Sequence, residues 1–587
     1  MNVKAQLKNA PASDIPLEST SAKQLAYLMI AGFDKSFRRF LSITKGAQKR
    51  FESCQWTESI QANKERINIY EDYLSDVVIE IYQRIHPHAQ QENFWHNVKD
   101  AFAKLTANHP QFELAETFYN SVIGRVFKHK KINNDWIFVM PNSCHLSGQQ
   151  RHKILNHLNV EGTVEDLFAE IFATYRFKVE YDNLQGDLNS LEHALRERLT
   201  KQQLSSVTNV DMLKPVFFRG KAAYLIGRIR MPDASLPFVI ALQMTEEKRI
   251  MVDALITKRA HMSFIFSFAR SYFMADTDYP AEVVSFLHEL LPHKKSFELY
   301  MCLGFFKHGK TVFFRDYLTH VEQSDDKFEL APGIKGLVMA VFHLPSYGVV
   351  FKIIKDEFAE SKKITRDHVK YCYNLVKTID RVGRMADTHE YIYFEFARDR
   401  FSDDLLNYLL DTCASSVEVT ETKVIIKHLY IERKMTPLNL YFQQEEDPEK
   451  VRSAIEDLGR CIKQIAHANI FPGDMLHKNF GITKTGRVIF YDYDEICFMN
   501  QRQFRALPKS DDPFAIDTLS VGPTDVFPEQ FEHFIVGKKH LKDLLKELHG
   551  DLLKPEYWQE VQQIASQGTM QNFTPYPPSL CFTRNYE

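Results

Sequence analysis

The chain has 587 residues, which is too long for one compact core and predicts about three or four domain-sized units, or fewer large ones. Its 73 Lys and Arg residues and 76 Asp and Glu residues give a net charge of −3, which argues against binding of nucleic acid through a basic surface. Hydrophobic residues make up 44% and charged residues 25%, as in ordinary globular proteins, so disorder of the whole chain is excluded.

The sequence predicts neither a membrane segment nor a secretory signal. No apolar run approaches the ~18 residues that cross a bilayer, and the first 23 residues lack a basic segment followed by an apolar one. The eight cysteines stand singly, without a CxxC pair or the spacing of metal ligands. Scattered cysteines in such a chain indicate reduced thiols in the cytoplasm, and we expect no structural zinc.

The first part of the chain is predicted to be mainly helical. Apolar residues recur at intervals of three and four between residues 67 and 85, and Pro87 ends that helix. The same periodicity predicts helices at 24–43, 113–127, 164–175 and 188–199. Three short runs rich in β-formers at 222–230, 237–243 and 249–255, separated by turns, predict a small antiparallel meander. Helical patterns return at 263–320.

A polar stretch at 321–327 is the expected boundary, so we divide the chain into 1–325 and 326–587. The second part begins with three strands and two turns within 328–355, followed by a helix at 365–382 and a strand at 423–431. Asp447 and Pro448 predict a capped helix start. A loop at 468–479 leads to strands at 480–483 and 487–491, and the tail beyond 511 is predicted to be mixed and largely helical.

The strongest chemical signal is Asp474-Met-Leu-His-Lys-Asn479 with Asp492 and Asp494 one hairpin later. Phosphoryl transfer from a nucleotide needs an aspartate at the attacking hydroxyl, and an asparagine and a second aspartate at a divalent metal. A hairpin between Asn479 and Asp492 would bring both to one sheet edge. Alternatively, Asp474 caps a turn and the two later aspartates are a solvated strand end.

Two upstream features strengthen the first interpretation. Lys352 lies inside an apolar strand, where a lysine can pair with nucleotide phosphates; Lys355 at the strand exit is the other candidate. About sixteen residues earlier, Gly333 and Gly336 allow a backbone to approach phosphates closely, although a simple hairpin turn fits equally well.

Two further segments are open to two interpretations each. In a kinase order of elements, residues 430–435 form the interlobe connection that meets adenine, but an ordinary strand-to-helix turn also fits. Residues 381–388 carry two arginines and Asp387 beside Gly383, and the pattern alone favours a helix C-terminal cap.

Several of these segments together resemble the bacterial isocitrate dehydrogenase kinase/phosphatase family along nearly the whole chain. The similarity rests on Phe471-Pro-Gly-Asp-Met-Leu-His-Lys-Asn479, Tyr491-Asp-Tyr-Asp-Glu495, Ala331-Pro-Gly-Ile-Lys-Gly336, His428-Leu-Tyr-Ile-Glu-Arg433, Asp380-Arg-Val-Gly-Arg-Met-Ala-Asp-Thr388 and Ala269-Arg-Ser-Tyr-Phe-Met274. The resemblance implies an α+β fold: an α-rich N-terminal regulatory domain with a small meander, followed by a bilobal protein-kinase-like domain.

The resemblance also implies a function. The enzyme would phosphorylate a serine of isocitrate dehydrogenase with ATP, and it would also remove that phosphate. Because the sequence shows no second set of phosphatase residues, the simplest account is one site that works in both directions with ADP and Mg²⁺. It would thereby control the branch between the citric acid cycle and the glyoxylate bypass. AMP would bind between the two domains as an allosteric effector that favours the phosphatase direction. The sequence leaves the oligomeric state open, with a homodimer as one option, and we expect no nucleic acid or membrane partner.

Carried over residue by residue, the resemblance implies a site in the second part of the chain. The catalytic residues would be Asp474 as base, Lys478, Asp494 and, for dephosphorylation, Asp387. The metal ligands would be Asn479 and Asp492. The nucleotide contacts would be Ala331, Pro332, Gly333, Ile334, Lys335, Gly336, Leu337 and Lys352.

The chain departs from ordinary protein kinases. Phe-Pro-Gly precedes Asp474 in place of His-Arg, Asp-Tyr-Asp replaces Asp-Phe-Gly, and no Ala-Pro-Glu follows. No Cys-x₅-Arg nucleophile is present for a separate phosphatase. Two other functions share part of the pattern: a catalytically inactive kinase fold that serves as a binding module, and a small-molecule phosphotransferase. Nucleotide binding without turnover would distinguish the first, while the large N-terminal half favours a protein substrate over the second.

Overall fold

The computed structural model describes residues 21–85, 92–129, 132–141, 150–159, 163–267, 272–333, 335–360, 362, 364–379, 382–507, 521–567 and 573–584. The chain divides into two compact units, Met1–Phe40 with Asn68–His145, and Leu41–Ile67 with Leu146–Glu587. Within the described ranges no helix has both the length and the apolar character needed to cross a bilayer.

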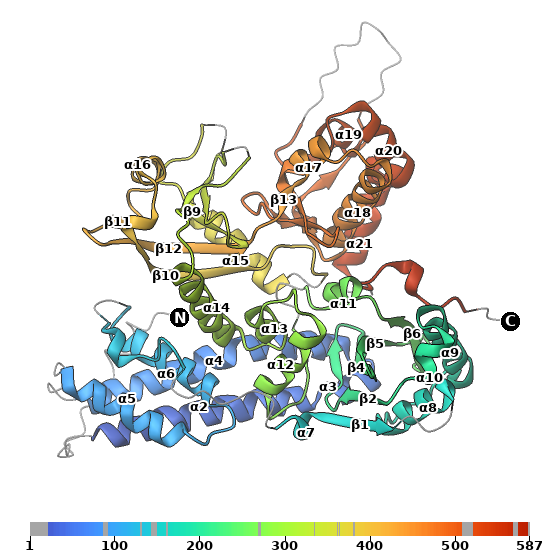
Figure 1. The fold of residues 1–587 in the computed structure, drawn as a ribbon. Helices are drawn as coiled ribbons and strands as arrows, with labels where there is room; N and C mark the ends of the chain where they lie inside the picture. Colours follow the sequence, from blue (N-terminus) through green and yellow to red (C-terminus); the bar gives the residue numbers. More distant parts are fainter. Residues whose placement is uncertain are drawn as a thin grey trace, which may run out of the picture. The chain divides into compact units, whose positions relative to one another are not determined.

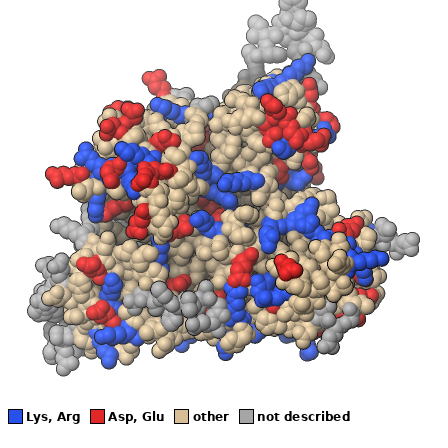
Figure 2. Space-filling model, viewed as in Figure 1, with Lys and Arg blue, Asp and Glu red and all other residues tan. Residues whose placement is uncertain are grey.

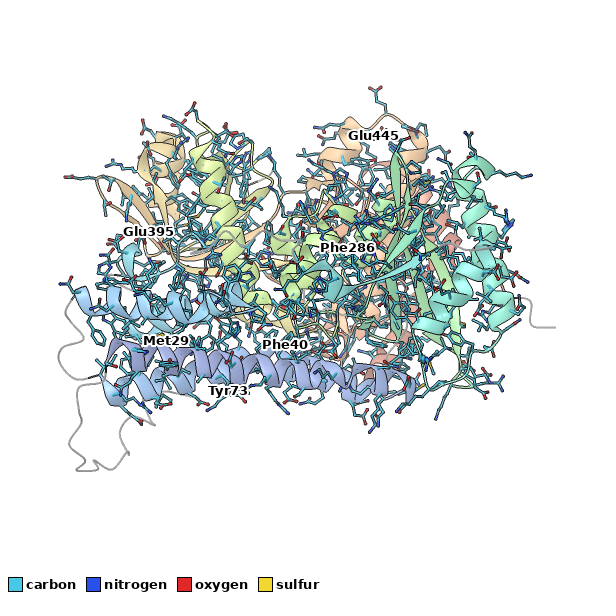
Figure 3. All side chains as sticks on the ribbon, turned by 60° about the horizontal axis from the view of Figure 1, so that its bottom comes forward. Met29, Phe40, Tyr73, Phe286, Glu395 and Glu445 are labelled. Atoms are coloured by element: carbon cyan, nitrogen blue, oxygen red, sulfur yellow. The ribbon has the colours of Figure 1, made fainter. Side chains whose placement is uncertain are left out.

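The first unit is built from helices (Figure 1). Its elements are α2 (Ala22–Lys45) and α4 (Trp56–Arg84), each in part, with α5 (Glu92–Thr106) and α6 (Phe112–Val126). Met29, labelled in Figure 3, is fully buried on α2, and the rings of Phe102 and Tyr119 pack with centroids 4.8 Å apart. The helices expected at 24–43, 67–85 and 113–127 are confirmed, whereas α5 was not predicted.

A six-stranded antiparallel sheet forms the first half of the second unit, in the order β1-β2-β4-β5-β6 with β3 paired to β4. The strands are β1 (Leu155–Asn159), β2 (Asn209–Leu213), β3 (Phe217–Arg219), β4 (Ala222–Met231), β5 (Ala234–Met244) and β6 (Ile250–Ile256). The predicted meander is therefore confirmed as β4 to β6, inside a larger sheet. Strands β4 and β5 are buried along most of their length, as expected for strands covered on both faces.

Short helices surround this sheet. One face packs against α8 (Val164–Thr174) and α9 (Leu184–Arg198), both of them predicted. The other helices of this region are α3 (Ala47–Glu52), α7 (Arg151–Ile154), α10 (Lys201–Ser205), α11 (Arg259–Ile265) and α12 (Pro280–Leu290). Phe286 of α12, labelled in Figure 3, is fully buried, and the Arg228 guanidinium carbon lies 4.9 Å from its ring centre.

A second six-stranded antiparallel sheet has the order β10-β12-β9-β8-β7, with β11 paired to β12. Its strands are β7 (Glu329–Leu330), β8 (Met339–His343), β9 (Val349–Ile354), β10 (Thr388–Ala397), β11 (Val417–Val419) and β12 (Lys423–Arg433). The strands expected at 328–355 and 423–431 are confirmed, while β10 and β11 were not predicted. Glu395 of β10, labelled in Figure 3, is exposed and pairs with Lys423 at 2.6 Å.

Helices from before residue 325 contribute to the core of this second sheet. Phe297 and Met301 of α13 (Ser296–Cys302) and Phe313 and Tyr317 of α14 (Phe306–Glu322) are buried in the same cluster as Phe351 of β9. The helix between β9 and β10, α15 (Arg366–Ile379), packs instead into the core of the C-terminal part, where the Tyr373 and Tyr430 rings stack at 4.3 Å. Helix α16 (Asp403–Thr412) lies between β10 and β11 in the chain.

The remaining elements form a largely helical part that follows β12. They are β13 (Thr436–Pro437), α17 (Leu438–Gln444), α18 (Pro448–His467), β14 (Ile470–Phe471), β15 (Phe480–Ile482), β16 (Val488–Phe490), β17 (Cys497–Phe498), β18 (Gln503–Phe504), β19 (Asp525–Val526), α19 (Phe531–Phe534), α20 (Lys539–His549) and α21 (Pro555–Ser566). The predicted cap is confirmed, because Asp447 accepts from the Glu449 amide and Pro448 is the first residue of α18.

In Figure 2 acidic and basic side chains are interspersed over the visible face.

Candidate active site

The hairpin of β15 and β16 brings the two halves of the Asp-and-Asn motif together. Phe480 pairs with Phe490, and the Tyr491 amide donates to the Asn479 carbonyl at 3.1 Å. Asn479 and Asp492 therefore lie at the same end of the hairpin. The Asn479 side-chain nitrogen donates to the Asp474 carbonyl at 3.1 Å, which fixes the amide and ties the loop to the hairpin.

The catalytic loop contains a tight turn at Gly473. Its φ of +76° lies in the left-handed region, and a Cβ there would come within 2.5 Å of the Glu495 carbonyl oxygen. Only glycine fits this position without movement of the backbone. The next residue, Asp474, accepts from the Leu476 amide at 3.1 Å through Oδ1, so its carboxylate is held at the surface of the loop in a half-buried position.

Lys352 lies in the middle of β9 and reaches the end of β16. Its Nζ donates to the Tyr491 carbonyl at 3.1 Å and pairs with Glu432 of β12 at 2.6 Å. The lysine is 7% exposed and the glutamate 1%. This ammonium group is therefore held against the residue that immediately precedes Asp492.

The loop between β7 and β8 leaves its backbone accessible. Gly333 has φ +114°, a Cβ at that position would meet no atom within 4 Å, and Leu337 is 45% exposed. At Gly336 a Cβ would come within 2.8 Å of the Met339 carbonyl, so glycine permits the close turn. Lys355, at the end of β9, donates to the Gly336 carbonyl at 2.7 Å and so fixes the loop to that strand. A glycine-containing loop with an accessible backbone allows a phosphate group to approach the backbone amides closely.

Asp387 reaches the site through a parallel pairing that the sequence did not suggest. Met385 pairs with Phe490 in parallel orientation, and the Ala386 amide donates to the Phe490 carbonyl at 3.0 Å. Because the two segments run side by side, Asp387 leaves this pairing two residues later at the same end as Asp492. Helix α15 ends at Ile379, and Asp387 lies eight residues further along, directly before β10.

The segment that carries Asp387 is anchored by a buried ion pair. Both Arg384 terminal nitrogens donate to Asp457 of α18 at 2.7 Å, and Arg384 Nε donates to Gln464 at 2.6 Å. Burial alone raises the pKa of Asp457, but the Arg384 guanidinium and its hydrogen bonds outweigh burial and lower that pKa to about 2. The same Asp457 accepts from the Val488 amide at 2.7 Å, so one carboxylate holds both the Asp387 segment and β16.

A cluster of carboxylates follows β16. Lys362, from the loop between β9 and α15, pairs with Asp494 at 3.1 Å and with Glu495. Burial and the neighbouring negative charge of Asp494 raise the pKa of Asp492 to about 7, although Lys352 and Lys362 oppose this. Burial alone lowers the pKa of Lys362, but its ion pairs raise that pKa above its ordinary value.

This donor set fits a magnesium ion bound with a nucleotide. Mg²⁺ prefers oxygen ligands and takes one or two protein groups together with substrate phosphates. The carboxylate of Asp492 and the amide oxygen of Asn479 are such ligands, and a bound cation would favour the charged form of a carboxyl group whose pKa is raised. Across the described residues no group of three or more His, Cys, Asp or Glu side chains forms a self-sufficient metal site.

The structure thus brings the predicted residues outside the 331–337 loop to one place. Asn479, Asp492 and Lys352 converge at the end of the hairpin, joined by the Tyr491 carbonyl and amide, and Asp474 is bonded to Asn479. The Lys478 carbonyl accepts from the Tyr491 hydroxyl, and its side chain is half-buried. The catalytic and binding roles of these residues stay predictions. Ile334, also expected to contact nucleotide, lies outside the described residues.

Sequence reasoning missed three side chains that organise this site: Glu432, Lys362 and Arg384. The strand expected at 423–431 ended one residue before Glu432, whereas β12 continues to Arg433. The sequence did indicate that the partner of Lys352 lies elsewhere, because the helix between β9 and β10 contains no glutamate that could pair with this lysine. The partners of Lys362 and Arg384 are more than 70 residues away in the chain, at a distance for which a single sequence gives no signal.

Comparison with known proteins gives matches along almost the whole chain. The family model of the isocitrate dehydrogenase kinase/phosphatase (AceK) regulatory domain matches residues 26–325, and that of the kinase domain matches residues 326–578. A Pseudoalteromonas atlantica protein named isocitrate dehydrogenase kinase/phosphatase is 61% identical over 95% of this chain and 98% of its own length. A Yersinia enterocolitica protein of the same name is 41% identical over the same shares of the two chains.

Among solved structures, a ROP18 kinase domain in complex with AMP-PNP and sucrose matches 43% of this chain and 93% of that chain. The sequence identity is 12% and the TM-score is 0.23.

Proposed function

This chain belongs to the isocitrate dehydrogenase kinase/phosphatase family, and on that premise we propose that it transfers the γ-phosphoryl group of ATP to a serine of isocitrate dehydrogenase and also removes that phosphate. In this way it would control the branch between the citric acid cycle and the glyoxylate bypass. The proposal rests mainly on the hydrogen bond from Lys352 to the Tyr491 carbonyl. This bond holds a lysine of the kind that binds nucleotide phosphates at the end of the hairpin where Asn479 and Asp492 lie.

Each of these residues has a role that follows from its place. Asp474, on a loop fixed by Gly473, would accept the proton of the attacking serine hydroxyl. Lys352 would hold the phosphates of the nucleotide, and the backbone of residues 331–337 would cover them. Asn479 and Asp492 would hold Mg²⁺, which supplies positive charge to the transferring group when it is bound. Lys478 and Asp494 would line the same site.

For dephosphorylation we propose the same site with ADP and Mg²⁺. Asp387 lies beside the hairpin end through its parallel pairing, where its carboxylate could orient a water molecule toward the phosphoserine. This arrangement needs no separate phosphatase nucleophile. The proximity of Asp387 to the end of β16 supports the proposal.

Two finer features are also proposed. AMP would act as an allosteric effector that favours the phosphatase direction, which rests on the family resemblance. The cytoplasm would be the compartment, which rests on the singly placed cysteines of the sequence.

We propose a division near residue 325, in the segment between α14 and β7. Because Phe313 and Tyr317 of α14 are buried against the second sheet, a chain that starts at 326 should be less stable than the full protein.

The proposed kinase activity is tested by transfer of ³²P from labelled ATP to purified isocitrate dehydrogenase, with and without AMP. Asp474→Ala should lower the transfer rate by about 10²- to 10⁴-fold while ATP still binds. Asp447→Ala is the matched control, because it removes an exposed capping carboxylate at the opposite end of α18 and should leave the rate unchanged. A wild-type rate in the Asp474 variant would disprove the assignment of the base.

A further inference from the structure

The acidic partner of Lys352 comes from a different element than in the protein-kinase template. In that template the lysine of the third strand pairs with a glutamate of the helix that follows it. Here the corresponding helix, α15, reads Arg-Asp-His-Val-Lys-Tyr-Cys-Tyr-Asn-Leu-Val-Lys-Thr-Ile. Its one acidic residue in sequence is Asp367, which is exposed in the first turn. The helix therefore cannot supply the usual partner.

The sheet supplies a partner instead. Tyr430 pairs with Lys352 and Glu432 pairs with Val350, so Lys352 and Glu432 are diagonal neighbours on one face of two adjacent strands. The Glu432 carboxylate lies 2.6 Å from Lys352 Nζ. On the other side, the Thr388 hydroxyl of β10 donates to Glu432 Oε1 at 2.8 Å. The Glu432 carboxylate of β12 is thus held between the Lys352 ammonium group of β9 and the Thr388 hydroxyl of β10.

We propose that Glu432 is the positioning residue of Lys352, that Thr388 orients Glu432, and that the lysine therefore has its ion pair without a side chain from α15. This inference rests on the proposed nucleotide role of Lys352. The Glu432 and Lys352 side chains are almost fully buried, and removing one partner of a buried ion pair leaves the other charge uncompensated.

The consequence concerns regulation. Kinases that take the glutamate from a mobile helix can be switched by moving that helix, because the ion pair then breaks. A partner on the central strands of a sheet does not move with the helix. In this protein, movement of α15 would not by itself remove the partner of Lys352, because Glu432 belongs to β12.

The test measures ³²P transfer from ATP in four variants of the full-length protein: Glu432→Gln, Lys352→Met, the double variant and Asp367→Asn. We expect Glu432→Gln to lower kcat/KM for ATP by about 10- to 100-fold, the size of effect caused by a misplaced catalytic group. The double variant should be no slower than Lys352→Met, because Glu432 acts only through the lysine. Asp367→Asn, the acidic residue of α15, should match the wild type.

Other outcomes distinguish the role of Glu432 from the proposed role of Lys352. If Lys352→Met is impaired while Glu432→Gln transfers phosphate at the wild-type rate, the inference is wrong and the proposed function stands. If Lys352→Met is itself unimpaired, both are wrong. If Asp367→Asn falls as far as Glu432→Gln, α15 is the partner after all. Should Glu432→Gln not fold, Thr388→Val removes only the hydroxyl, and an unchanged KM and kcat in that variant would contradict the inference.

Discussion

Replacing Gly473 by alanine should damage the catalytic loop more than its small size suggests. An L-residue at φ +76° costs about 1–2 kcal/mol. The new Cβ would also lie 2.5 Å from the Glu495 carbonyl oxygen and 2.8 Å from the Glu495 Cβ, and relieving such overpacking costs about 1–3 kcal/mol. We therefore expect the free energy of unfolding to fall by about 2–5 kcal/mol, unless the loop moves.

A movement of the loop would relieve the contact between the new Cβ and Glu495, but it would also displace Asp474. Asp474 follows Gly473 directly, and a displacement of about 1 Å lowers a catalysed rate by about 100-fold. The substitution should therefore reduce kinase turnover, stability or both. Thermal unfolding and ³²P transfer from ATP to isocitrate dehydrogenase, measured on the same preparation, separate the two effects.

Gly486→Ala is the matched control. Gly486, in the turn of the β15–β16 hairpin, has a similar φ of +82°, but a Cβ there would meet no atom within 4 Å. This variant should lose only the backbone contribution of about 1–2 kcal/mol and keep its kinase rate. If Gly473→Ala behaves like Gly486→Ala in both assays, the contact with Glu495 does not hold Asp474 in place.

Three further predictions follow from the site. Asp492→Ala should abolish kinase and phosphatase activity together, whereas Asp387→Ala should impair phosphatase more than kinase; normal dephosphorylation by the first variant would reveal a second site. Lys362→Met should change the Mg²⁺ concentration needed for half-maximal activity in both directions, because it leaves the carboxylate of Asp494 unneutralised; an unchanged Mg²⁺ titration would contradict this role. The pKa of Asp457, about 2 against an ordinary 3.8, corresponds to about 2 kcal/mol of stability that is present above pH 4 and lost as the pH falls toward 2. The difference in free energy of unfolding between the wild type and Asp457→Asn should therefore shrink over that range.

Features that depend on near neighbours in the chain could be predicted from the sequence. The apolar stripe of α18 repeats at helical spacing, and its Ile455, Leu458 and Ile462 are fully buried as that spacing predicts. The cap at Asp447 and the hairpin after Asn479 are likewise local, because both depend on residues within a dozen positions. The motif from Asp474 to Asp492 could be recognised for the same reason.

The tertiary structure alone decided which distant side chains complete the site. Lys352 meets Glu432 because two strands 80 residues apart are adjacent in the sheet. The segment before Asp387 lies beside β16 because Met385 pairs with Phe490, about 105 residues later in the chain. Strand pairing over such separations is set by the packing of whole layers, so a single sequence carries no local pattern for it. That is the physical reason why the sequence could predict the hairpin that carries Asn479 and Asp492, while the partner of Lys352 and the place of Asp387 were visible only in the folded chain.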